Sequence, residues 1–74
     1  MFVKRKLIKL PPSAKFVYWL ISEYGPLSRR ELEKISLMPQ RTIGYALNTL
    51  LRNGLIFKEK KKNRNAHVLY YVNQ

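Results

Sequence analysis

The chain has 74 residues, and its 15 lysine and arginine residues against four acidic ones give a formal net charge of +11. This length allows one domain with a thin core, and the lack of cysteine excludes disulfides and thiolate metal sites. Four acids and a single histidine offer no acid–base pair, no nucleophile and no set of metal ligands, so we expect neither an enzyme nor a cofactor.

The excess of positive charge predicts an anionic partner, because a small domain with this charge repels itself unless an anion relieves the repulsion. The candidates are nucleic acid, an anionic membrane surface and an acidic protein, and composition alone does not choose among them. No apolar run approaches the roughly 20 residues of a membrane span, and the N-terminus lacks the apolar core of a signal peptide. We therefore expect a cytoplasmic protein.

Residues 1–10 alternate imperfectly between apolar and cationic residues, which predicts an N-terminal strand or an extended arm. The cations of this segment fit two interpretations equally well: Lys4, Arg5 and Lys6. They contact DNA, or they lie on the solvent side of an edge strand, where cations discourage aggregation.

The first helix opens at Pro11 and Pro12, because proline suits the first turn of a helix. It ends at Gly25 and Pro26, where glycine can adopt a left-handed cap and proline cannot continue the helix. Apolar residues recur at helical spacing in between: Ala14, Val17, Leu20, Ile21 and Tyr24. Four further aromatic residues are expected mainly in the core or at a dimer surface: Tyr18, Trp19, Tyr70 and Tyr71.

The second helix has the clearest local signature in the chain, a capping box formed by Ser28 and Glu31. In this motif each side chain accepts a hydrogen bond from the backbone N–H of the other residue. Leu27 and Leu32 flank the cap at the spacing of a hydrophobic staple. We expect Leu32 and Ile35 to face the core, the helix to end near residue 36, and residues 37–39 to form a tight turn.

A third helix is predicted over residues 39–53, with apolar residues at three- and four-residue spacing: Ile43, Ala46, Leu47, Leu50 and Leu51. The opposite face carries Gln40, Arg41, Gly44, Tyr45, Asn48 and Arg52. After Gly54 the hydrophobic period changes toward 2, which predicts strands at residues 55–62 and 66–72 joined by a turn at 63–65. These strands make a β-hairpin with a cationic tip.

This order of elements predicts an α+β fold, the winged helix-turn-helix, over residues 11–74. It has three helices, a C-terminal β-hairpin as the wing, and a possible N-terminal strand at residues 1–10. In helix-turn-helix proteins the second helix of the motif lies in the major groove of DNA, and the first crosses the backbone. Residues 39–53 are therefore the predicted recognition helix, and residues 57–70 the basic wing.

Four stretches resemble the small archaeal winged-helix regulators related to the MarR family: residues 10–15 (LPPSAK), 25–28 (GPLS), 37–47 (LMPQRTIGYAL) and 50–56 (LLRNGLI). The resemblance covers roughly residues 10–73 and implies transcriptional regulation through DNA binding. MarR-type proteins usually dimerise through flanking helices, and none is predicted after the wing. A dimer surface is therefore expected elsewhere on this chain.

The polar face of the recognition helix carries the predicted DNA contacts. Arg41 can bridge O6 and N7 of guanine, Gln40 and Asn48 can pair with adenine, and Tyr45 can pack on a sugar or a thymine methyl group. The full set is Gln40, Arg41, Thr42, Gly44, Tyr45, Asn48 and Arg52.

Two residues of that set have a second explanation. Thr42 donates to a phosphate or satisfies a helix terminus. Gly44 costs about 1 kcal/mol relative to alanine inside a helix, which either a close approach of DNA or tight packing against the second helix explains.

The wing residues are expected to contact phosphates or the minor groove: Lys58, Lys60, Lys61, Lys62, Asn63, Arg64 and Asn65. The asparagines also fit as turn formers. Further phosphate contacts are predicted at the start of the second helix, where backbone N–H groups favour anions: Ser28, Arg29 and Arg30.

The favoured function is that of a DNA-binding transcriptional regulator. The alternatives are a general nucleic-acid binder, chromatin-like or RNA-binding, and a winged-helix module that binds an acidic protein. The polar face of the third helix has no lysine, which favours base reading over purely electrostatic binding. The predicted partner is double-stranded DNA, with no membrane and no small-molecule ligand. Because two half-sites usually lie one helical turn apart, we also expect a homodimer through residues 2–10 and the first helix.

Overall fold

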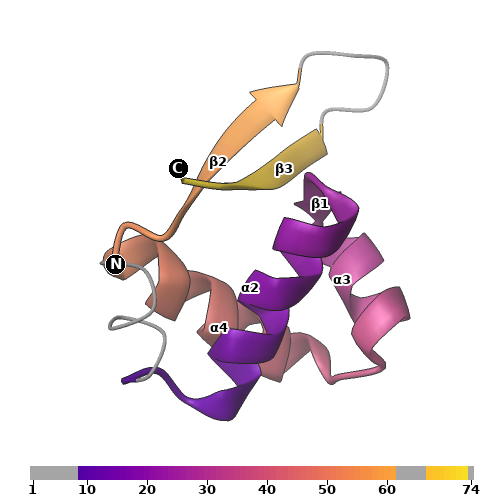
Figure 1. The fold of residues 1–74 in the computed structure, drawn as a ribbon. Coiled ribbons are helices and arrows are strands. Elements are labelled where there is room, and N and C mark those ends of the chain that lie inside the picture. Colours follow the sequence, from indigo (N-terminus) through magenta and orange to yellow (C-terminus); the bar gives the residue numbers. More distant parts are fainter. Residues whose placement is uncertain (1–8, 62–66, 74) are drawn as a thin grey trace.

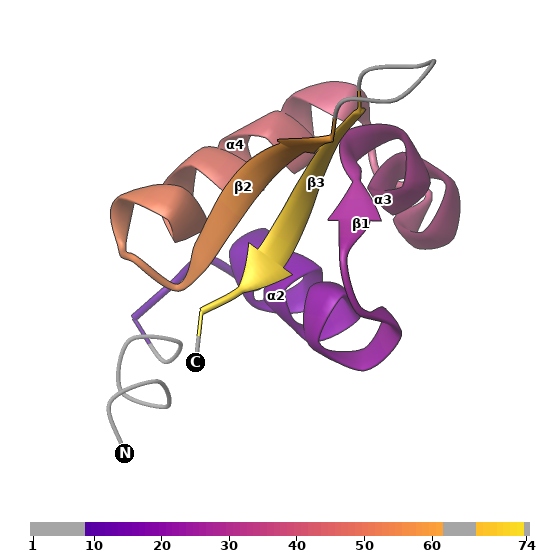
Figure 2. The ribbon, with the colours of Figure 1, turned by 90° about the horizontal axis from the view of Figure 1, so that it is seen from above.

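A computed structural model of the chain describes residues 9–61 and 67–73. These residues form α2 (Pro12–Tyr24), β1 (Leu27–Ser28), α3 (Arg29–Ser36), α4 (Gln40–Arg52), β2 (Ile56–Lys61) and β3 (His67–Val72). The described part of the chain is thus an α+β fold with three helices and a three-stranded antiparallel sheet. The sheet lies to one side of the helices, and the β2–β3 hairpin projects beyond them (Figures 1 and 2).

The first predicted helix is present as α2, with Pro12 in its first turn and Pro11 as its N-cap. Four of the five residues at helical apolar spacing form its buried face, namely Ala14, Val17, Leu20 and Ile21, whereas the fifth, Tyr24, is 61% exposed. Gly25 ends the helix and donates its N–H to the carbonyl of Ile21 at 3.0 Å. Its φ of 82° is positive, as predicted, but its ψ of −164° is extended. The predicted left-handed cap at Gly25 is therefore wrong, and the chain leaves α2 directly toward β1.

The capping box at the start of α3 is confirmed. Glu31 donates its backbone N–H to Ser28 Oγ at 3.1 Å, and Ser28 donates its backbone N–H to the Glu31 carboxylate at 2.8 Å. Leu27 and Leu32, the predicted staple, are both buried. Leu37 caps the other end with a left-handed φ of 60° and opens the turn to α4.

The prediction that Ile35 faces the core is wrong, since its side chain is 41% exposed. Only Leu32 of α3 is buried. The helix has eight residues, and its last turn runs into the connection at residues 37–39, where Leu37 is 87% exposed. The core covers Leu32 and is contacted again by Met38 after the helix, but it leaves Ile35 and Leu37 exposed.

The third predicted helix is present as α4, with the predicted end residues Pro39 and Asn53 acting as its caps. Its apolar stripe is buried as expected, apart from Leu51, which is half-buried against the core. Gly44 departs from the prediction: it is buried, whereas the sequence places it on the polar face. The group that covers it is described with the candidate site.

The sheet has the order β1-β3-β2, and both pairings are antiparallel. The hairpin strands are confirmed, with Ile56 opposite Val72 at one end and Lys61 opposite His67 at the other. The sequence did not predict β1, because two residues are too short to show a strand period. The predicted N-terminal strand and the predicted turn at residues 63–65 lie, apart from residues 9 and 10, outside the described residues.

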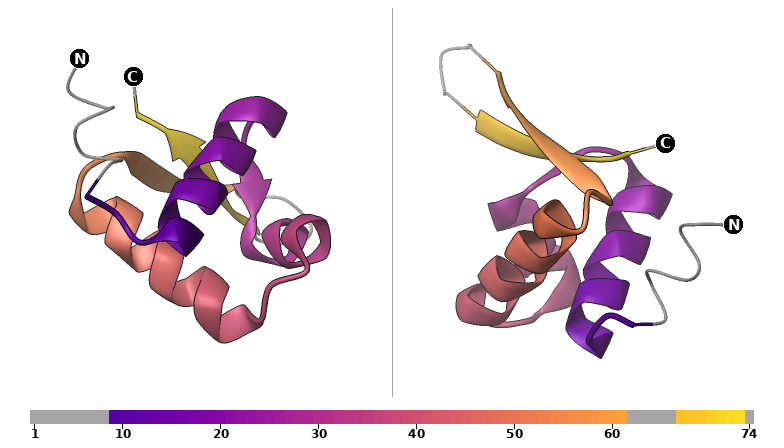
Figure 3. Two further views of the ribbon diagram at one scale, coloured as in Figure 1. Left: turned by 60° about the horizontal axis from the view of Figure 1, so that its bottom comes forward. Right: turned by 90° about the vertical axis from the view of Figure 1, so that its left-hand side faces the viewer.

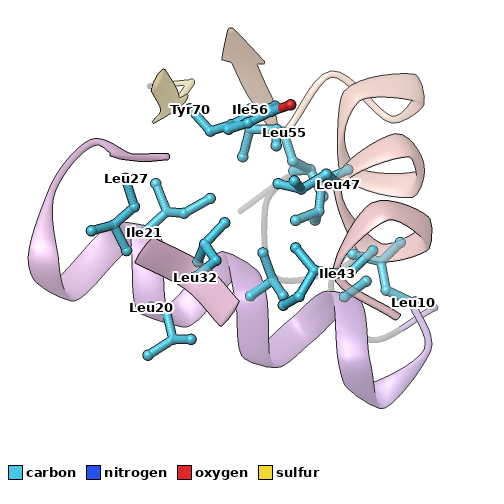
Figure 4. Packing of buried hydrophobic residues seen from close by; sticks show 14 residues of the cluster. Leu10, Leu20, Ile21, Leu27, Leu32, Ile43, Leu47, Leu55, Ile56 and Tyr70 are labelled. Atoms are coloured by element: carbon cyan, nitrogen blue, oxygen red, sulfur yellow. The ribbon is translucent and has the colours of Figure 1, made fainter. Parts of the chain in front are cut away.

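Fourteen buried apolar residues from the helices and the sheet form the core (Figure 4). Leu55, Ile56 and Tyr70 enter it from the sheet side, opposite Ile21 and Ile43 of the helices. No polar or charged side chain of the described residues is buried. Every cation whose side chain the structure describes therefore lies at the surface. None of the described helices has the length and hydropathy to cross a membrane.

The unequal burial of Leu32 and Ile35 can be tested with two matched substitutions in α3. Leu32→Ala should lower the free energy of unfolding by about 2–5 kcal/mol, because it leaves a cavity in the core. Ile35→Ala should cost less than about 1 kcal/mol, since that side chain is already partly in water. Urea denaturation measures both. Equal losses for the two variants would contradict the packing of α3 described here.

Candidate nucleic-acid interface

One polar stripe runs along the outer side of α4. Arg41, Tyr45, Asn48 and Arg52 follow one another at four-, three- and four-residue intervals, so they share one face of the helix. All four are exposed, and Tyr45, which the sequence predicted to lie outside the core, is 54% exposed. No other described element covers this side of α4 (Figure 3). The stripe is therefore open to a partner along the length of the helix.

Two more predicted residues lie at the start of α4. Gln40 is the first residue of the helix and is exposed. Thr42 is half-buried on the flank of the stripe. The stripe thus begins with exposed polar groups at the end of α4 that follows the turn from α3.

Arg29 covers Gly44, and this contact joins α3 to α4. A methyl group built on Gly44 would collide with the Arg29 guanidinium, whose Cζ would lie 3.3 Å away. Every atom found within 4 Å of that methyl position belongs to the Arg29 guanidinium. Of the two explanations for Gly44, packing against the second helix is therefore the one the structure supplies, and the packed group is a cation. Because Gly44 has no side chain, the Arg29 guanidinium can lie against it, beside the stripe.

The start of α3 is occupied by its own capping box. Ser28 and Glu31 use each other's backbone N–H groups, so the Glu31 carboxylate lies at the helix N-terminus. Arg29 and Arg30 follow the cap as exposed residues of the first turn. Phosphate binding at this end stays a prediction, and the two arginine side chains are better placed for it than the engaged Ser28 hydroxyl.

Two lysines of β2, Lys58 and Lys60, share one face of the hairpin. Side chains alternate along a strand, and Ile56 of β2 is buried in the core. Lys58 and Lys60 therefore extend from the same face as Ile56, beyond the end of the core, and both are exposed. Lys61 closes β2 opposite His67. The remaining predicted wing residues lie outside the described part of the chain: Lys62, Asn63, Arg64 and Asn65.

A shallow groove brings the start of α3 next to the hairpin. It is lined by residues 28–31 on one side and by Val68, Leu69 and Tyr70 of β3 on the other. The backbone pairing of Ser28 with Leu69 fixes this arrangement. Arg29 therefore lies between the hairpin stem and the stripe on α4. The structure thus brings together the three predicted segments: the start of α3, the outer side of α4 and the base of the hairpin.

The stripe on α4 contains no acidic residue. All four acids of the chain are glutamates, and they lie in α2, α3 and β2. Glu31 is held in the capping box, and Glu59 belongs to the face of β2 opposite Lys58 and Lys60. The described residues contain no cluster of histidine and acidic side chains that could hold a metal ion. The outer side of α4 thus carries cations and no acidic side chain.

Sequence reasoning missed two contacts, one beside the stripe on α4 and one on the opposite face of the hairpin. The contact of Arg29 with Gly44 depends on the crossing of α3 and α4. The sequence signal for it was a glycine inside a helix with no single explanation. The stacking of Phe57 on Tyr71, with ring centroids 5.0 Å apart, depends on their pairing in the hairpin. That pair would have been found from the sequence if the strand register had been known.

Comparisons of the chain with protein-family models, with curated proteins and with solved structures found no match.

The contact between the Arg29 guanidinium and Gly44 can be tested by a double-mutant cycle. Gly44→Ala should add about 1 kcal/mol of helix propensity, but in the wild-type background it must also push the guanidinium aside. In an Arg29→Ala background nothing opposes the new methyl group, so the gain should be larger by about 0.5 kcal/mol or more. Chemical denaturation of the four chains measures the difference. If Gly44→Ala changes the free energy of unfolding equally in both backgrounds, the Arg29 guanidinium does not contact Gly44.

Proposed function

We propose that this protein binds double-stranded DNA as a winged helix-turn-helix protein, with α4 as its recognition helix and the β2–β3 hairpin as its wing. The order of helices and strands and the three-stranded antiparallel sheet are compatible with that fold. Transcriptional regulation is the role we assign to it, in keeping with the sequence resemblance to small winged-helix regulators.

The observation that carries this proposal is the stripe on α4. It presents two arginines, a tyrosine and an asparagine on one exposed helix face that has no acidic residue. A helix about 10–12 Å across fits the major groove, which is about 12 Å wide. The stripe therefore combines a suitable shape with side chains that can hydrogen-bond to base edges.

Each residue of the stripe has a chemical role in this proposal. Arg41 donates two hydrogen bonds to O6 and N7 of guanine, and Asn48 pairs with N6 and N7 of adenine. Tyr45 packs on a sugar or a thymine methyl group. Arg52, one turn further along, neutralises a backbone phosphate. Gln40 at the start of the helix is a further candidate for reading adenine.

The surrounding cations position the protein on the duplex. Arg29, held beside the stripe by Gly44, and Arg30 reach the phosphates that flank the major groove. Lys58 and Lys60 extend the positive surface along the hairpin toward the backbone or the minor groove. Contacts of this kind supply affinity that does not depend on sequence. The base contacts of α4 then supply the discrimination.

A general nucleic-acid binder would use the same cations without base readout. The composition of the stripe favours sequence reading, because arginine, asparagine and tyrosine present directional groups and no lysine is present.

Affinity for duplex DNA should fall steeply with salt. Four described cations lie around the stripe: Arg29, Arg30, Lys58 and Lys60. At about −0.9 per phosphate neutralised, they imply a slope of log affinity against log salt of roughly −4 or steeper. Fluorescence anisotropy with labelled duplexes from 50 to 300 mM salt, for example, measures the slope. If this protein binds an acidic polypeptide at low salt but does not bind duplex DNA, the proposal is wrong.

Substitutions should separate base reading from phosphate binding. On a site selected from a random duplex pool, Arg41→Ala should cost about 1–3 kcal/mol and relax the preference. Lys60→Ala should weaken binding to all duplexes alike and reduce the salt slope by about 1. Lys34→Ala, an exposed lysine in the last turn of α3, is the control and should change little. If Arg41→Ala weakens selected and random duplexes equally, the protein is a general binder.

A further inference from the structure

The outer face of α2 carries an exposed aromatic pair that the proposed DNA interface does not use. Phe16 and Trp19 stack with ring centroids 6.4 Å apart and an interplanar angle of 9°. They are 40% and 51% exposed, so both rings meet solvent on one side. Paired aromatic rings left in water are typical of a surface that another molecule covers.

This aromatic surface continues onto the sheet. Phe16 and Trp19 line a shallow hollow together with Tyr18 and Ser22. Tyr18 and Ser22 also line the neighbouring hollow, whose far wall contains the stacked rings of Phe57 and Tyr71. The surface thus spans α2 and the outer side of the hairpin stem. It is large compared with a single exposed apolar side chain, which would need no explanation.

The charges on α2 indicate what kind of partner fits. The whole chain carries +11, so two copies repel each other over most of their surface. The charged residues of α2 are Lys15 and Glu23, which are both exposed and sum to zero. The outer face of α2 is therefore a place where two copies can approach without bringing an excess of positive charge together.

The spacing of these charges is self-complementary. Lys15 lies four residues before Trp19, and Glu23 lies four residues after it, so all three share one face of α2. In an antiparallel pair of α2 helices related by a two-fold axis at Trp19, each Lys15 meets the Glu23 of the other copy. The two Trp19 rings then meet at the axis. Such a closed two-fold contact is the commonest form of association between identical chains.

We propose that the outer face of α2 binds a second copy of this chain in an antiparallel arrangement centred on Trp19. The inference does not depend on DNA binding. The inner face of α2 packs against α4, and its outer face is directed away from α4 (Figure 1). A dimer formed in this way leaves the stripe on α4 exposed in both copies.

A charge exchange tests the pairing. In Lys15→Glu the new glutamate of each copy faces Glu23 of the other copy, so the dimer contains two repulsive pairs. Association should weaken by roughly tenfold. The double variant Lys15→Glu, Glu23→Lys should restore the wild-type dissociation constant. Lys34→Glu, which makes the same change in net charge on α3, is the matched control and should not weaken association, because the lower net charge reduces the repulsion between copies. Sedimentation equilibrium of the full chain over a range of concentrations measures all four proteins. Failure of the double variant to restore association would overturn the arrangement.

Trp19 provides an independent measurement, because it is the only tryptophan of the chain. Its emission should shift to the blue as concentration rises, with the same midpoint as dimer formation. Trp19→Ala should raise the dissociation constant by at least about 30-fold, in the range of a central interface residue. A monomer at every concentration, or a dimer unaffected by Trp19→Ala, would overturn the proposal. A monomer with blue-shifted emission throughout would instead mean that another part of the same chain covers this face. Duplex binding, measured separately on the same variants, tells whether the DNA-binding proposal fails as well.

Discussion

The antiparallel pairing of Leu27 and Ser28 with Tyr70 and Leu69 joins the helical part of the chain to the hairpin. These two residues act in three ways at once: as a strand, as the N-cap of α3, and, through Leu27, as part of the core. Because Ser28 is both paired with β3 and fixed in the capping box, the direction of α3 is set relative to the sheet. The groove between α3 and the hairpin, and with it the position of Arg29, follows from this short contact.

A thin core with no buried charge has a consequence for function. None of the described charged side chains is buried, so the fold distributes a large positive charge over a small surface. No glutamate lies in α4, and the Glu31 carboxylate accepts a hydrogen bond from the backbone N–H of Ser28. The outer side of α4 and the outer face of α2 therefore differ in kind: the first is polar and cationic, and the second is aromatic and electrically balanced. We interpret this difference as a division between binding DNA and binding a second copy.

Local sequence signals predicted the helices well. The prolines before α2, the capping box of α3 and the apolar stripe of α4 each describe interactions between residues at most four positions apart, which need no knowledge of the fold. The change of period after Gly54 likewise predicted both hairpin strands. Features that depend on which element covers a residue were predicted less well. Ile35 has the right spacing from Leu32 to be buried, yet no other element covers it and its side chain is 41% exposed. Gly44 was assigned to the polar face because a helical pattern alone does not reveal a guanidinium from another helix.

The sequence by itself determined the secondary structure of α2, α3, α4 and the hairpin, the surplus of positive charge, and the set of polar residues on α4. Those properties arise from backbone preferences, caps and hydrophobic period, all of which act over a few residues. Only the tertiary structure decided that residues 27 and 28 pair with β3, that Arg29 lies on Gly44, and that Phe16 and Trp19 stack in water on the far side of α2. These contacts join residues by the crossing of elements, or depend on which faces the core leaves uncovered, and neither is encoded in local spacing.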